Sequence, residues 1–208
     1  MQNSQVRRKL STFLSHREVR NIKEARFPLK KHLVDFKRDK YDNEFLPKFE
    51  ELETLGFITN KENIILIGTP GAGKTHYSIA LGIAACMKGY SVLFASIPNL
   101  IVDLKETMNN NQFNSYRRHF ERYDLVILDE LGYVSLEKSG CEMLFNLISS
   151  RNDKGSILLT STLLLTVGKR FSETLLFTGA LITRLAHKAH ILDILRELST
   201  FATGGRQK

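Results

Sequence analysis

The stretch Gly68-Thr69-Pro70-Gly71-Ala72-Gly73-Lys74-Thr75 decides the fold expected of this chain. It fits the pattern G-x-x-x-x-G-K-[ST]. An apolar run at residues 63–67, typical of a buried parallel strand, precedes it, and a helical pattern at residues 74–88 follows. Strand, glycine loop and helix in this order direct several backbone N–H groups and the positive end of a helix at one anion. The sequence therefore predicts a phosphate loop at residues 68–75 that binds a nucleoside triphosphate.

Two residues of this loop have separate expected roles. We expect Lys74 to contact the β- and γ-phosphates, and the Thr75 hydroxyl to be a ligand of Mg²⁺. ATP and Mg²⁺ are therefore the expected cofactors. The predicted ATP-binding residues are Gly68, Thr69, Pro70, Gly71, Ala72, Gly73, Lys74, Thr75 and His76.

A second chemical signal follows the apolar strand pattern at residues 124–129, which ends in Asp129 and Glu130. Ligands of open α/β sheets bind at the carboxyl ends of the strands, so these acids are expected to face the phosphate loop. Asp129 fits the acid that holds magnesium, and Glu130 fits the general base that orients the attacking water. The alternative is an exposed acidic strand end. The pair predicts a Mg-dependent ATPase, in which Glu130 and Lys74 are the catalytic residues.

The net charge of +8 is concentrated in one part of the 208-residue chain. Residues 1–40, which we call the basic arm, contain 12 Lys or Arg and 4 Asp or Glu, so they account for the whole excess. A basic arm beside a neutral core favours a polyanionic partner, most simply duplex DNA bound with little sequence preference. The alternative is a solvated helical face. The candidate DNA contacts are Arg7, Arg8, Lys9, Arg17, Arg20, Lys23 and Arg26.

Other features narrow the class of protein. No apolar run approaches the roughly 18 residues that a membrane span requires, and the N-terminus lacks the apolar segment of a signal peptide. Cys86 and Cys141 lie in apolar helical stretches and are expected to be buried, reduced thiols. These observations predict a cytoplasmic protein without a membrane partner.

The rest of the pattern alternates strands with helices and predicts an α/β fold, a three-layer sandwich around a five-stranded parallel sheet. A basic helical segment with a linker (residues 1–60) is expected before a core at residues 61–198, and a helical lid is expected to be absent or vestigial. The predicted strands are 63–67, 91–95, 124–129, 156–161 and 189–194. The predicted helices are 74–88, 98–109, 113–121, 140–152 and 179–187, with a helix or helical pair within 4–26.

Two further positions are candidates by their spacing. Thr162 follows the strand at residues 156–161, where related ATPases place a polar residue that senses the γ-phosphate. Arg184 lies where an arginine could reach the γ-phosphate of a neighbouring subunit and act as an arginine finger. The alternative for Arg184 is an ordinary surface arginine on an amphipathic helix.

Several segments resemble the IstB-like ATP-binding proteins of the AAA+ superfamily. The likeness is carried by the phosphate loop with His76, by the segment Asp129-Glu130-Leu131-Gly132-Tyr133, and by Arg184-Leu185-Ala186-His187. It covers roughly residues 20–198. Members of this family are encoded by insertion sequences, assist a partner transposase in DNA transposition, and are related to DnaC-type helicase loaders. The resemblance implies an ATPase that assembles as a homo-oligomer on DNA, selects target sites and stimulates the transposase.

The chain departs from the family pattern at a few positions. Thr162 stands where the family usually has Asn, Thr183 replaces the usual Asp, and the tail at residues 199–208 diverges from the expected ending. Three alternatives therefore stay open: a DnaC-like helicase loader, a protein that binds ATP with little hydrolysis, and a small-molecule kinase. Glu130, the basic arm and the lack of an evident lid argue against the kinase.

Overall fold

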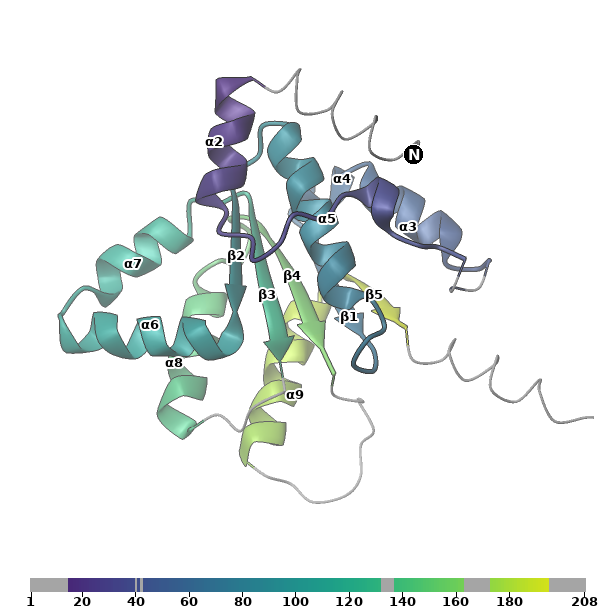
Figure 1. Ribbon diagram of the computed structural model, residues 1–208. Coiled ribbons are helices and arrows are strands. Elements are labelled where there is room, and N and C mark those ends of the chain that lie inside the picture. Colours follow the sequence, from purple (N-terminus) through teal and green to yellow (C-terminus); the bar gives the residue numbers. More distant parts are fainter. Residues whose placement is uncertain (1–14, 40, 42, 132–136, 163–172, 195–208) are drawn as a thin grey trace, which may run out of the picture.

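The computed structural model describes residues 15–39, 41, 43–131, 137–162 and 173–194, with backbone only at residues 173–178. Its centre is a sheet of five parallel strands in the order β2-β3-β4-β1-β5. Figure 1 shows helices on both faces of the sheet. The strands are β1 (Asn63–Ile67), β2 (Val92–Ser96), β3 (Leu125–Leu131), β4 (Ser156–Ser161) and β5 (Ala189–Asp193).

Alternate residues of each strand face two separate apolar layers. In β1, Ile64 and Leu66 pack towards α5 (Lys74–Met87), whereas Ile65 and Ile67 pack towards the helices on the opposite face. That second layer is covered by α6 (Ile97–Asn109), α7 (Phe113–Phe120), α8 (Lys138–Ser149) and α9 (Glu173–Ala186). A strand covered on both sides must be apolar throughout, which explains the continuous apolar runs in the sequence.

The segment before β1 joins the same core as α5. It contains α2 (His16–Glu24), the 3-10 helix η1 (Leu33–Asp35), α3 (Leu46–Glu53) and α4 (Gly56–Thr59). Phe36, Phe49, Leu52 and Phe57 of this segment are buried in the α5 layer. The described residues between Leu33 and Thr59 therefore form short helices that pack on the same apolar layer as α5.

Helix α2 begins with a capping box. The Ser15 hydroxyl accepts a hydrogen bond from the Glu18 N–H, and the Glu18 carboxylate accepts one from the Ser15 N–H. The two bonds satisfy N–H groups that have no partner within the helix. At its far end the Ala25 carbonyl accepts a hydrogen bond from Phe94 N–H of β2 at 2.8 Å. Helix α2 is therefore attached to the edge of the sheet.

Several predicted boundaries differ from the structure. Strand β3 continues to Leu131 instead of ending at residue 129, and α9 begins at Glu173 instead of residue 179. Helix α8 begins at Lys138, two residues earlier than predicted, and ends at Ser149, three residues earlier than predicted. Its end is set by the turn that follows, where Asp153 has a φ of 59° and Arg151, almost fully buried, donates to backbone carbonyls. No helix in the described part of the chain is long and apolar enough to cross a bilayer.

Candidate nucleotide-binding site

The phosphate loop leaves the sheet at the end of β1 and enters α5. Gly71 and Gly73 have φ values of 83° and 89°, which are strained for residues that carry a Cβ atom. A Cβ atom at Gly73 would also lie 2.6 Å from the Tyr41 hydroxyl oxygen. Helix α5 begins immediately afterwards at Lys74, so its N-terminal N–H groups lie at the loop. The loop therefore has the backbone form of an anion site at a helix N-terminus.

Lys74 is folded back onto the phosphate loop. Its Nζ atom donates to the carbonyl oxygens of Gly68 at 2.8 Å and Thr69 at 2.9 Å, and the side chain is only 7% exposed. Burial lowers the pKa of Lys74, while the nearby Asp129 charge acts in the opposite direction. The loop carbonyls thus hold a buried ammonium group beside the place where a phosphate would bind.

Asp129 is buried near the carboxyl ends of β3 and β4, where two hydroxyl groups donate hydrogen bonds to its carboxylate. The Thr75 hydroxyl donates to both carboxylate oxygens of Asp129 at 3.1 Å, and the Thr160 hydroxyl donates to Oδ1 at 2.6 Å. Hydroxyl and carboxylate oxygens are the hard ligands that Mg²⁺ prefers, so Thr75 and Asp129 fit a magnesium ion bound with phosphate oxygens. Thr160 fixes the orientation of the Asp129 carboxylate.

Glu130 occupies a different environment from its neighbour. Its side chain is exposed, its φ is 70°, and its N–H donates to the Thr160 hydroxyl at 3.0 Å. A positive φ is unusual for a residue with a Cβ atom and bends the chain locally. The bend coincides with the shift in register between β3 and β4 at Leu128 and Leu131. Although the two residues are adjacent in sequence, the carboxylate of Asp129 is therefore buried and that of Glu130 is exposed to solvent.

A cavity of about 350 Å³ opens beside the phosphate loop, on the side of the N-terminal segment. Its lining combines the backbone of the loop with aromatic rings, and Phe36 forms edge contacts with the His76 ring at 5.7 Å. Burial, followed by the charge of Lys31, lowers the pKa of His76 and favours the neutral imidazole. Such a space suits a flat, weakly polar ring. The lining residues are Asp35, Phe36, Lys37, Tyr41, Gly71, Ala72, Gly73 and His76.

Thr162, the predicted sensor, lies just beyond β4, where its N–H donates to the Leu131 carbonyl at 3.4 Å. The threonine whose hydroxyl contacts Asp129 is Thr160, for which the sequence predicts no role. Thr160 pairs with Leu66 in the register between β4 and β1, two residues before the phosphate loop, and this register is a property of the sheet that the sequence pattern does not give. Tyr41 and Phe36 were also missed, and no motif in their neighbourhood indicates a role.

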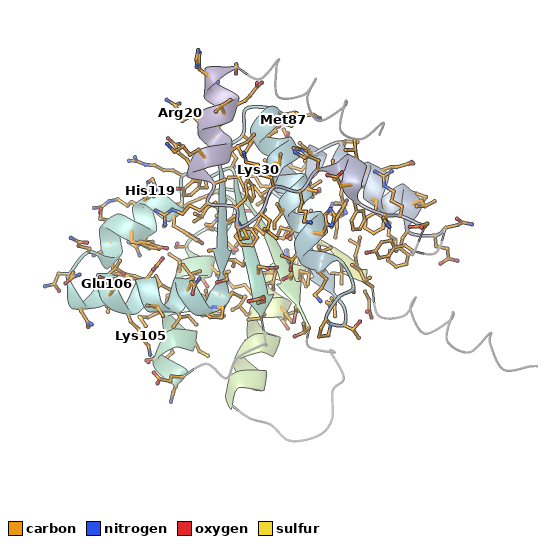
Figure 2. The ribbon with its side chains drawn as sticks, viewed as in Figure 1. Arg20, Lys30, Met87, Lys105, Glu106 and His119 are labelled. Carbon is orange, nitrogen blue, oxygen red and sulfur yellow. The ribbon has the colours of Figure 1, made fainter. Side chains whose placement is uncertain are left out.

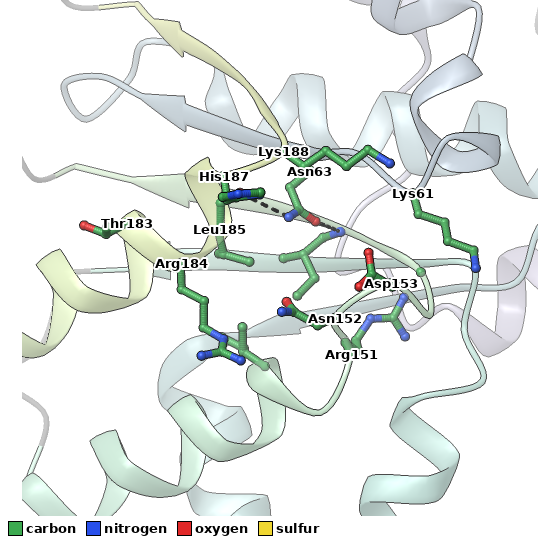
Figure 3. A pocket seen from close by; sticks show the side chains of 13 residues that line it. Lys61, Asn63, Arg151, Asn152, Asp153, Thr183, Arg184, Leu185, His187 and Lys188 are labelled. Carbon is green, nitrogen blue, oxygen red and sulfur yellow. Dashed lines mark hydrogen bonds between the residues drawn. The ribbon is translucent and has the colours of Figure 1, made fainter.

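Arg184 lies near the amino ends of the strands, whereas the phosphate loop lies at their carboxyl ends. It belongs to the last turn of α9, is exposed, and its guanidinium carbon lies 5.4 Å from the centre of the Phe145 ring. It lines a second cavity of about 490 Å³, which also contains Asn63 at the start of β1 and Gly155 just before β4 (Figure 3). Arg184 is therefore remote from the phosphate loop of its own chain.

The candidate DNA contacts are partly described. Arg17, Arg20 and Lys23 are exposed on α2, and Arg26 is exposed just after it. Figure 2 shows Arg20 projecting from α2 at the edge of the molecule. The pair Arg20–Glu24, at 3.8 Å with both side chains more than 60% exposed, does little to neutralise this face. Arg7, Arg8 and Lys9 lie outside the described residues.

The strand order, the loop between β1 and α5, and the acids near the carboxyl end of β3 define an α/β fold of the AAA+ type. The structure of AMPPCP-bound DnaA from Aquifex aeolicus superposes with a TM-score of 0.66 at 20% identity, covering 82% of this chain and 51% of that one. The crystal structure of the DnaC helicase loader gives a TM-score of 0.57 at 20% identity, covering 78% of this chain and 95% of that one. At this identity the two structures support the fold.

The sequence identifies the family. Residues 5–200 match the family described as IstB-like ATP binding protein, and the chain belongs to that family. A Pseudomonas aeruginosa protein named "Insertion sequence IS21 putative ATP-binding protein" is 35% identical over 182 residues, covering 85% of this chain and 66% of that protein. The corresponding protein of insertion sequence IS232 from Bacillus thuringiensis subsp. berliner is 30% identical over 179 residues, covering 84% of this chain and 70% of the relative. The chain thus spans about two thirds of the length of these relatives.

Proposed function

We propose that this chain binds ATP with Mg²⁺ at the phosphate loop, hydrolyses it, and uses the nucleotide to control a DNA-bound oligomer that assists a transposase. The observation that supports it most strongly is the 3.1 Å contact between Thr75, in the first turn of α5, and Asp129, near the end of β3. It brings together the two side chains that would hold a magnesium ion, next to the Lys74 ammonium. Lys74 and the loop N–H groups bind and orient the phosphates.

Glu130 is the proposed general base. Its solvated carboxylate follows directly on Asp129 and can accept a proton from a water aligned with the γ-phosphate. Magnesium supplies charge neutralisation for the triphosphate when it is bound. A protein that binds ATP with little hydrolysis remains the competing proposal, and a slow wild-type rate that is unchanged in Glu130→Gln would favour it.

Arg184 is proposed to act on the nucleotide of a neighbouring subunit. Its place near the start of β1, remote from its own phosphate loop, excludes action on its own nucleotide without a large rearrangement. A mixing experiment tests this proposal. Arg184→Ala and Glu130→Gln should each be inactive alone, and a mixture should recover part of the ATPase activity, because the second variant supplies Arg184 to the first. Lys188→Ala removes a different cation from the same cavity and is the matched control.

The exposed cations of α2 are proposed to contact the phosphates of duplex DNA. Replacing Arg17, Arg20 and Lys23 together by Gln should weaken binding to all DNA sequences. The slope of log affinity against log salt concentration should become less steep, by the release of roughly three counterions. Lys48, Lys61 and Lys138, also exposed, give a charge-matched control triple variant. Point variants are preferable to truncation, because α2 packs on α5 and the Ala25 carbonyl binds β2. Equal loss in both triple variants would show that only net charge matters.

The transposase partner is proposed from the family alone. Insertion sequences give their names to the relatives, and DnaC, whose structure has a similar fold, is named as a helicase loader. Tagged chain should therefore retain a transposase encoded with it in the presence of ATP and DNA. Retention of a replicative helicase instead would favour the loader. A measurement of size in each nucleotide state tests the proposed homo-oligomer.

A further inference from the structure

The segment that joins α2 to α3 runs from the sheet edge to the phosphate loop. It starts at Ala25, bound to Phe94 of β2, and continues past Phe36, which is buried against the Tyr77 ring of α5 at 4.9 Å. It ends on Tyr41, whose hydroxyl donates to the carbonyl oxygen of Ala72 at 2.6 Å. Ala72 lies within the phosphate loop, between the two glycines with positive φ.

This hydrogen bond acts on a peptide unit that matters for phosphate binding. The peptide between Ala72 and Gly73 is trans, so its carbonyl and its N–H point in opposite directions. Holding the Ala72 carbonyl towards Tyr41 therefore holds the Gly73 N–H away from Tyr41. In a loop of this kind, N–H groups directed at one point form the anion site.

The Tyr41 ring is itself held in place. It stacks on Phe36 with ring centres 5.3 Å apart and an angle of 25° between the planes, and it meets the edge of Phe49 at 5.2 Å. Both phenylalanines are buried in the α5 layer. A ring fixed on two sides cannot swing freely, so its hydroxyl is a rigid donor for the loop.

We propose that Tyr41 is a positioning residue for the phosphates: its hydroxyl fixes the Ala72–Gly73 peptide so that the Gly73 N–H faces the triphosphate. The inference rests on the proposed binding of ATP and adds the residue that sets the shape of the loop. Tyr41 acts through the backbone, so its contribution depends on the phosphates of the ligand and not on the base. The same contact accounts for glycine at position 73, where a Cβ atom would meet the Tyr41 hydroxyl.

The experiment compares Tyr41→Phe with wild-type protein. ATP and adenosine are each titrated as competitors of a fluorescent ATP analogue, and melting is followed without ligand. Tyr41→Phe should bind ATP roughly fivefold more weakly, the value of one neutral hydrogen bond, with unchanged affinity for adenosine and an unchanged melting temperature. Tyr90→Phe is the matched control, because that hydroxyl contacts Thr59 outside the site, at 3.3 Å.

Two results would overturn the inference while leaving ATP binding intact. One is an ATP affinity of Tyr41→Phe equal to that of wild type. The other is an equal loss for ATP and adenosine, which would place the hydroxyl at the base instead of the loop. If ATP failed to displace the fluorescent analogue from the wild-type chain at any concentration, both the proposed function and this inference would be wrong.

Discussion

The hydroxyl of Thr75 and the carboxylate of Asp129 lie 3.1 Å apart, although the two residues are 54 positions apart in the chain. The parallel sheet makes this contact possible, because β1 and β3 both end on the same side of the sheet: Asp129 lies near the end of β3, and Thr75 lies in the helix that follows β1 and its loop. Thr160, from β4 between them, donates to the same carboxylate at 2.6 Å. Three strand ends thus build one polar cluster beside the phosphate loop.

Asp129→Asn tests the proposed magnesium ligand. The amide keeps the shape and can still accept from Thr75 and Thr160, so the melting temperature without nucleotide should change little. The negative charge is lost, so the stimulation of ATP binding by Mg²⁺ should fall at least tenfold. Binding is measured with Mg²⁺ varied at constant ATP. An unchanged dependence of ATP binding on Mg²⁺ would show that Asp129 is not a magnesium ligand.

Glu130→Gln tests the general base. Because the Glu130 side chain is exposed and its backbone makes the bond to Thr160, the substitution should leave ATP binding within about twofold of wild type. Hydrolysis should fall roughly 100- to 10,000-fold, the usual contribution of a positioned base. Phosphate release under saturating ATP measures it. Retention of most of the wild-type activity would assign the base elsewhere.

The lowered pKa of Lys74 predicts how ATP binding depends on pH. Only the protonated ammonium attracts phosphate, and burial moves its pKa below the ordinary value of 10.5. As pH rises, affinity should therefore begin to fall at a lower pH than an ordinary lysine would allow, by up to about tenfold per pH unit above the lowered pKa. Adenosine, which lacks phosphates, is the control ligand. A parallel decline for adenosine would mean that the site itself unfolds.

Gly73→Ala tests the backbone of the phosphate loop. A residue with a Cβ atom at a φ of 89° costs about 1–2 kcal/mol, and the methyl group would also meet the Tyr41 hydroxyl. The free energy of unfolding in urea should fall by at least that amount, and ATP binding should be lost. Gly179→Ala is the control: that residue lies within α9 with open space around it, so alanine should raise stability by about 0.5–1 kcal/mol. If both variants were destabilised, the loss at Gly73→Ala could not be attributed to the positive φ of Gly73.

Much of this fold could be predicted because apolar periodicity and the phosphate loop are local signals. The strands at residues 63–67 and 156–161 match β1 and β4 at both ends, and the five-stranded parallel sheet of the AAA+ type is confirmed. The end of β3 was missed, because Asp129 and Glu130 are polar and read as the end of a strand. In the structure they continue the strand, since Asp129 is buried by its hydroxyl partners.

The site could be predicted only where a motif names the residue. Lys74, Thr75 and Asp129 belong to motifs, and the structure brings them together. Tyr41 reaches the phosphate loop from 31 residues away through packing on Phe36 and Phe49, and no spacing in the sequence encodes such a contact. Thr160 and Thr162 share one face of the predicted strand pattern, so alternation does not distinguish them. The structure does, because β4 ends at Ser161 and only Thr160 lies within the strand, with its hydroxyl on Asp129.

The central claim is that a triphosphate and its metal bind between Lys74 and Asp129. The most direct measurement is a calorimetric titration of the wild-type chain with ATP, first with Mg²⁺ and then with EDTA. The account predicts one ATP per chain and a sharply weaker affinity once magnesium is chelated. Equal affinity in both buffers, or no binding in either, would contradict it.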